Sequence, residues 1–174
     1  MVVIFYLSSA VAVAATILAV TRVSVVHALL YLIASLLAVA VLFFTLGAPF
    51  AAALEVIVYA GAIMVLFVFV VMMLNLGERT LAQERAWLRP RVWLGPGLLA
   101  LILLDELLYV IGMGAHTPYR VAMTGPEAVG AALYGPYALA VELASLMLLA
   151  GLVGAYHLGR HALQGGPADG ERPQ

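Results

Sequence analysis

The chain has 174 residues, of which 66% are hydrophobic and 10% are charged, and its mean hydropathy is +1.12. A soluble domain lacks the polar surface to cover so much apolar material, so the composition predicts an integral membrane protein in contact with a lipid bilayer. The net charge of −1 argues against a nucleic-acid partner, and the absence of cysteine excludes disulfides, iron–sulfur ligation and thiolate zinc sites within the chain.

Five apolar stretches are each long enough to cross about 30 Å of hydrocarbon as a helix, which predicts an all-α fold. In chain order, these spans are predicted at about 2–20, 23–46, 50–75, 92–112 and 137–158. Glycine and proline, which end helices, mark the breaks between them. A loop rich in glycine, proline and tyrosine is predicted over about 113–136. We predict one transmembrane domain over 1–163, followed by a loose tail over 164–174.

The positions of the arginines predict the orientation of the chain. The first positive charge, Arg22, follows the first apolar run, which predicts a retained helix and not a signal peptide. With five spans, one side of the membrane receives Arg22, Arg79, Arg85, Arg89, Arg91, Arg160 and Arg172, whereas the other side receives Arg120. Because cytoplasmic loops carry the excess of positive charge, we predict an N-terminus outside and a cytoplasmic C-terminus.

Two polar side chains interrupt the third apolar stretch. Glu55 and Tyr59 precede an uninterrupted hydrocarbon run, and their spacing of four residues puts them on one helical face. An acid inside a membrane helix costs about 2.5–3.5 kcal/mol on insertion scales, so such acids usually face a protein interior or a water-filled cavity. Glu55 is therefore a candidate proton carrier, and the hydroxyl of Tyr59 is suited to hold a water chain. In the alternative, Glu55 reaches the outer interface or only bonds a neighbouring helix.

Gly61 follows on the same helix, between two alanines, near the middle of the predicted membrane span. A glycine at such a place lowers helix stability by about 1 kcal/mol relative to alanine. It allows a close approach of a neighbour or a local irregularity such as a π-bulge. Simple helix packing is the alternative.

Three further acids lie inside predicted spans, namely Asp105 and Glu106 in the fourth and Glu142 in the fifth. They are candidates for a lesser polar path, and hydration near the outer interface is the alternative. Adjacent helical residues point about 100° apart, so at most one of Asp105 and Glu106 faces a given partner. His157 and His161 have a spacing that suits a metal, but with no third ligand in view we predict no metal site.

The run EVIVYAGAIMVLFVFVVMMLN, which begins at Glu55, closely resembles the third transmembrane helix of the subunit J family of proton-pumping NADH–quinone oxidoreductase, respiratory complex I. The segment HALLYLIASLLAVAVLFF over 27–44 and the five-span layout extend this resemblance, which fades after about Arg85. It implies a core membrane-arm subunit of an enzyme complex in the bacterial inner (plasma) membrane. It also implies that FMN, iron–sulfur clusters and quinone bind in other subunits, with no cofactor or catalytic centre in this chain.

The resemblance further implies a position between the quinone-reactive heel subunits and the antiporter-like pumps, beside subunit K. In this family the third helix can form a π-bulge near the positions that match Tyr59 and Gly61. Its rotation then makes or breaks a hydrated path between quinone chemistry and the pumps, and this role carries over to Glu55, Tyr59 and Gly61. Two alternatives stay open: a subunit of a related cation/proton antiporter or membrane-bound hydrogenase, and a passive packing subunit.

Overall fold

A computed structural model describes residues 2–74, 90–114 and 123–164. The chain divides into two compact units, Met1–Gly125 and Pro126–Gln174. The prediction of one transmembrane domain over 1–163 therefore stays a prediction. Parts of the predicted connections, with Arg79, Arg85, Arg89 and Arg120, lie outside the described residues, as do Arg172 and nearly all of the predicted tail.

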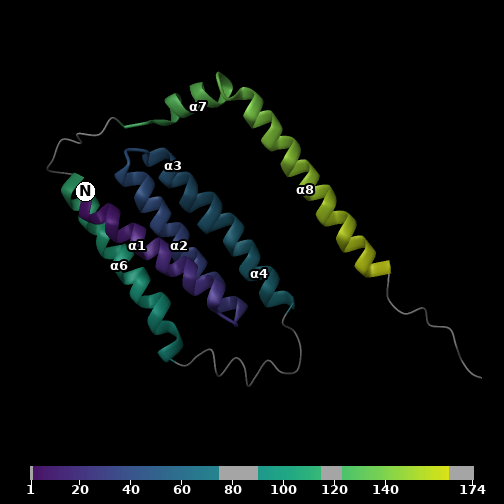
Figure 1. The fold of residues 1–174 in the computed structure, drawn as a ribbon, viewed down its shortest axis with the longest axis horizontal. Coiled ribbons are helices and arrows are strands. Elements are labelled where there is room, and N and C mark those ends of the chain that lie inside the picture. The colour runs from purple at the N-terminus through teal and green to yellow at the C-terminus, as the bar shows by residue number, and fades with distance from the viewer. Residues whose placement is uncertain (1, 75–89, 115–122, 165–174) are drawn as a thin grey trace, which may run out of the picture. The chain divides into compact units, whose positions relative to one another are not determined.

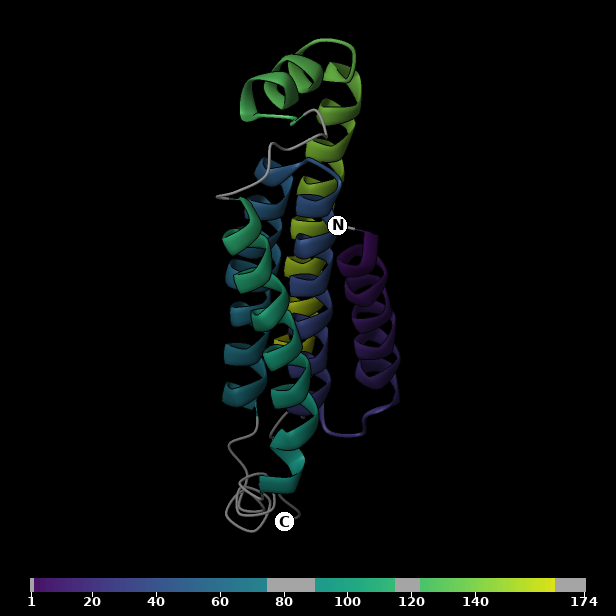
Figure 2. The same cartoon turned by 90° about the vertical axis from the view of Figure 1, so that its left-hand side faces the viewer.

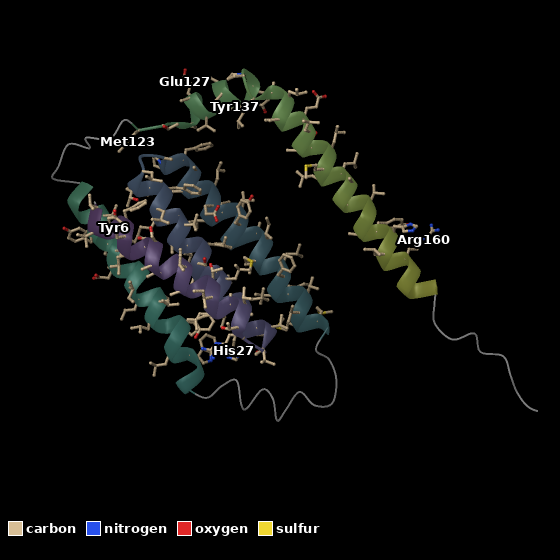
Figure 3. The ribbon with its side chains drawn as sticks, viewed as in Figure 1. Tyr6, His27, Met123, Glu127, Tyr137 and Arg160 are labelled. Atoms are coloured by element: carbon tan, nitrogen blue, oxygen red, sulfur yellow. The ribbon has the colours of Figure 1, made fainter. Side chains whose placement is uncertain are left out.

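The first unit consists of long helices that run side by side and alternate in direction (Figures 1 and 2). These are α1 (Val2–Thr21), α2 (Val25–Thr45), a continuous helix three (Pro49–Leu74) and α6 (Pro90–Gly114). Helix three has three parts, α3 (Pro49–Leu54), η1 (Glu55–Ile63) and α4 (Met64–Leu74). Tyr6 near the start of α1 and His27 near the start of α2 lie at opposite ends of this unit, as antiparallel helices require (Figure 3).

The central helix of the first unit is α2, which contacts α1, all parts of helix three and α6. A cluster of buried residues joins α1, α2 and α6 and comprises Val11, Ala12, Ala38 and Leu103. Ala15 and Ala38 are fully buried, and side chains of this size let membrane helices approach closely. Packing of small residues therefore holds α1 and α6 against α2.

Five helices are long and apolar enough to cross a membrane, over Val2–Thr21, Val25–Thr45, Pro49–Met73, Trp93–Val110 and Ala138–Arg160. Each overlaps one predicted span and differs from it by a few residues at the ends. The prediction of an all-helical protein with five membrane-length helices is confirmed.

The second unit contains α7 (Pro126–Tyr134) and α8 (Ala138–Gln164). The prediction of a loop throughout 113–136 is wrong, because α7 lies inside it. Pro126 occupies the first helical position, where its missing N–H is harmless, and Glu127 complements the helix dipole in the first turn. Nine residues are too few to span the hydrocarbon, so α7 adds a helix without adding a crossing.

The predicted break between the second and third spans is confirmed as a tight turn. Gly47 has φ 83°, its N–H donates to the Phe44 carbonyl at 3.1 Å, and the Ala48 N–H donates to the Phe43 carbonyl at 2.9 Å. This pattern closes the C-terminus of α2 around a left-handed residue, for which glycine is favoured. Pro49 then starts helix three at once.

We expect Gly47→Ala to destabilise the first unit by roughly 1–2 kcal/mol, because a Cβ is unfavourable in the left-handed conformation. The measurement is the thermal midpoint of the assembled complex. Gly112→Ala is the matched control, since a Cβ at Gly112 meets nothing within 4 Å. Equal midpoints for the two variants would contradict the prediction.

Candidate functional site

Helix three changes its winding at the polar residues. Glu55–Ile63 is a π-helix, in which backbone hydrogen bonds span five residues in place of four. Its end is closed by the Met64 N–H, which donates to the carbonyl oxygens of Tyr59 and Gly61. An irregularity of the kind that Gly61 permits is therefore present. Glu55, Tyr59 and Gly61, which the sequence singles out, all lie within it.

The backbone of the π-helix passes close to Gly61. A Cβ added at Gly61 would lie 3.0 Å from the carbonyl oxygen of Val56, five residues earlier. Such a contact is tighter than ordinary van der Waals packing, so any larger residue would press on the backbone of η1. Glycine, which has no Cβ, is therefore the residue that this π-helical winding accommodates best at position 61.

Helix three is the least covered helix of the first unit. In the most apolar part of the Pro49–Met73 span 6% is buried, against 22% to 28% in the corresponding parts of the other three spans of this unit. Ala60 and Met64 are buried, at 9% and 3% exposure, whereas Tyr59 is 52% exposed and Glu55 is half-buried. The phenol of Tyr59 therefore lies on a face that the other described helices of the first unit leave open.

The three lesser acids occupy different surroundings. Glu106 on α6 is 4% exposed and accepts a hydrogen bond from Ser8 of α1, whereas the adjacent Asp105 is exposed. The two carboxyl groups thus diverge, as neighbours on a helix do. Glu142 is exposed on α8 in the second unit. A polar path that joins these three acids stays a prediction.

An apolar groove of about 450 Å³ separates helix three from α6. Its lining consists of hydrocarbon side chains, among them Val41, Ala52, Val56, Leu103 and Leu107. None of the described residues that line it is polar. The groove therefore provides no polar connection between the π-helix and Glu106.

Comparison with known proteins decides the family. A family described as NADH-ubiquinone/plastoquinone oxidoreductase chain 6 matches residues 15–158. NADH-quinone oxidoreductase subunit J of Pseudomonas aeruginosa is 61% identical over 160 residues, which cover 90% of this chain and 95% of the relative. The chain belongs to the NADH-quinone oxidoreductase subunit J family.

Other subunit J proteins agree with this assignment. The one from Escherichia coli (strain K12) is 55% identical over 167 residues, with 92% of this chain and 88% of the relative covered. The one from Buchnera aphidicola subsp. Schizaphis graminum is 47% identical over 157 residues, with 90% and 96% covered. The family match extends to residue 158, beyond Arg85, after which the resemblance is expected to fade. The chain is a multi-pass membrane subunit of an enzyme complex.

Sequence reasoning did not anticipate the polar contacts between helices of this chain. The hydroxyls of Thr16 on α1 and Ser35 on α2 lie 2.8 Å apart, and Ser35 also donates to the Ala12 carbonyl at 3.1 Å. Hydroxyl residues inside apolar stretches are the one available signal, and it does not reveal which helices pair. Among the described residues, no group of three His, Asp or Glu side chains is arranged to hold a metal ion.

Proposed function

We propose that helix three of this subunit is a conformational gate that couples quinone reduction elsewhere in complex I to proton translocation. The observation that carries the proposal is the π-helix, which contains Glu55, Tyr59 and Gly61 on the least covered helix of the first unit. π-Helical turns are rare and occur frequently at functional sites. A break in regular winding at the acid of an otherwise apolar helix is most simply explained by a function.

The π-helix supplies a way to rotate side chains without unfolding. Each π-turn holds one more residue than an α-turn, so conversion to α-helix rotates the following segment by about 100° relative to the preceding one. Tyr59 would then move between the open face of helix three and another environment. Such a rotation makes or breaks a chain of water molecules that includes the phenol and the Glu55 carboxyl group.

The proposed orientation follows from the arginine distribution, with the N-terminus outside and the C-terminus in the cytoplasm of a bacterial inner membrane. Glu55 lies six residues after Pro49, about 9 Å along the helix, and so in the outer part of the membrane. The open face of helix three is the surface that we assign to neighbouring subunits, especially subunit K and the heel subunits that hold the quinone site.

The chain itself is proposed to carry no electrons and to have no catalytic centre. Iron–sulfur clusters are held mainly by cysteine ligands, and this sequence has no cysteine. FMN requires a flavin-binding site. We therefore place FMN, the clusters and quinone in other subunits. Relatives named as NADH-quinone oxidoreductase subunits favour complex I over the antiporter and hydrogenase alternatives.

The double substitution Glu55→Gln with Tyr59→Phe tests the gate. It removes the acid and the hydroxyl with little change of shape, so we expect the complex to assemble and to pump severalfold fewer protons per electron. The measurement is the ratio of proton uptake to NADH oxidation in membrane vesicles. Tyr6→Phe is the matched control, because Tyr6 is an exposed tyrosine on α1. An unchanged ratio in the assembled double variant would support the passive packing alternative.

A further inference from the structure

A carboxyl group is enclosed where α6 meets α1, apart from helix three. Glu106 is 4% exposed and Ser8 is completely buried, and the two residues lie 98 positions apart in the sequence. The Ser8 hydroxyl donates to Oε2 of Glu106 at 2.6 Å. The second carboxyl oxygen, Oε1, is buried and has no hydrogen-bond partner.

Hydrocarbon surrounds this contact on both sides along the two helices. On α1, Ile4 and Val11 lie about one turn before and after Ser8, and on α6, Leu103 and Val110 lie about one turn before and after Glu106. All four of these apolar side chains are at most 6% exposed. The carboxyl group therefore sits in a dry layer between two apolar layers.

No opposite charge compensates Glu106 within the described part of the first unit. On α6 the neighbouring charged group is Asp105, which adds negative charge, and on α1 the facing polar group is the neutral Ser8. On α2, His27 lies at the opposite end of the unit from Tyr6 (Figure 3), and Arg22 lies beyond the far end of α1, where its guanidinium contacts Tyr31. An ionised carboxylate with one hydrogen bond and one bare oxygen would be strongly unfavourable at such a place.

We propose that Glu106 is a proton-binding site and is carried as a neutral carboxylic acid at the α1–α6 contact. Ser8 holds Oε2 as the carbonyl oxygen, and the proton resides on Oε1, which removes the need for a buried cation. A neutral carboxylic acid has one hydrogen-bond donor and remaining acceptor capacity. It therefore leaves far less buried charge and hydrogen-bonding capacity unsatisfied than an ionised carboxylate does. The site is independent of the proposed gate, because the apolar groove separates α6 from helix three.

The hydrogen bond that Ser8 donates to Oε2 links α1 to α6, and the proposed proton on Oε1 lets this link form without a buried charge. Asp105, which is exposed on the next position of α6, offers a matched acid outside this enclosure.

Infrared spectroscopy of the assembled complex at neutral pH tests the proposal through the carbonyl stretch of protonated carboxyl groups. Glu106→Gln is expected to remove one such band, and Asp105→Asn is expected to leave that band in place. Ser8→Ala is expected to keep the band and move it to higher wavenumber, because the carbonyl oxygen loses its hydrogen bond. Glu55→Gln with Tyr59→Phe is expected to leave it unchanged, so failure of the gate and failure of this site are distinguishable.

Several outcomes would overturn the proposal. One is an infrared spectrum in which Glu106→Gln removes the band of an ionised carboxylate and leaves the bands of protonated carboxyl groups unchanged. Another is a protonated-carboxyl spectrum that neither Glu106→Gln nor Ser8→Ala alters. Because glutamine matches the shape of the neutral acid, we expect Glu106→Gln to assemble normally. A complex that lacks this subunit in Glu106→Gln but retains it in Asp105→Asn would show that a charge is required, and would also overturn the proposal.

Discussion

Replacing Gly61 with alanine is expected to shift helix three from the π-helical to the α-helical winding. The higher helix propensity of alanine, about 1 kcal/mol over glycine, is measured against the unfolded chain and does not distinguish the two windings. The contact of a new Cβ with the Val56 carbonyl oxygen, at 3.0 Å, does distinguish them, because it is unfavourable in the π-helix. This contact therefore disfavours the π-helical state.

The consequence for function follows if the gate uses both windings during turnover, as we propose. A variant held in the α-helical state is expected to lose proton pumping per electron while the complex still oxidises NADH with an artificial acceptor. The measurements are the structure of helix three in the assembled Gly61→Ala complex and its proton-to-electron ratio. Gly151→Ala controls for the substitution itself, since a Cβ at this helical glycine in α8 meets nothing within 4 Å. A π-helix that persists in Gly61→Ala with normal pumping would contradict the prediction.

The candidate gate could be predicted from the sequence because its signal is local. Glu55 and Tyr59 are conspicuous in a hydrocarbon run, and Gly61 is the one glycine within the third span. These three residues lie within two turns of one helix, so no knowledge of helix pairing is needed to bring them together. Composition allowed a π-helix but could not place its ends at Glu55 and Ile63, because the winding depends on backbone contacts such as that between Gly61 and Val56.

Contacts between helices could not be predicted from the sequence, because they join residues that are distant along the chain. Ser8 and Glu106 are far apart in the sequence, and five apolar spans can be arranged in many ways that satisfy hydropathy equally well. Sequence spacing showed that Asp105 and Glu106 point apart, but it could not show which of them faces α1. The helix α7 was missed because glycine and proline dominate its surroundings, whereas its helical character comes from Pro126, Glu127 and the alanines that follow.

Substituting Gly95 with alanine is expected to produce the largest loss of stability among the variants of α6. The hydroxyl of Tyr31 on α2 occupies the place where a Cβ at Gly95 would project, and Tyr31 is 4% exposed, so its ring has little room to move. Its hydroxyl also accepts a hydrogen bond from Arg22 at 3.4 Å, and the guanidinium lies 5.2 Å from the ring centroid. Overpacking of this kind costs roughly 1–3 kcal/mol.

A second substitution distinguishes this clash from a general effect of alanine. Tyr31→Phe removes the overlapping hydroxyl, and the next ring atom, Cζ, lies 3.1 Å from the added Cβ, a contact that a small shift relieves. The double variant Gly95→Ala with Tyr31→Phe is therefore expected to be more stable than the sum of the single changes predicts, by about 0.5–3 kcal/mol of coupling. The measurement is the thermal midpoint of the four complexes in the cycle, with Gly97→Ala as a control because a Cβ there meets no neighbour within 4 Å. Strict additivity would mean that α6 and α2 do not meet through Gly95 and Tyr31, and the packing of α6 against the central helix would then have to be different.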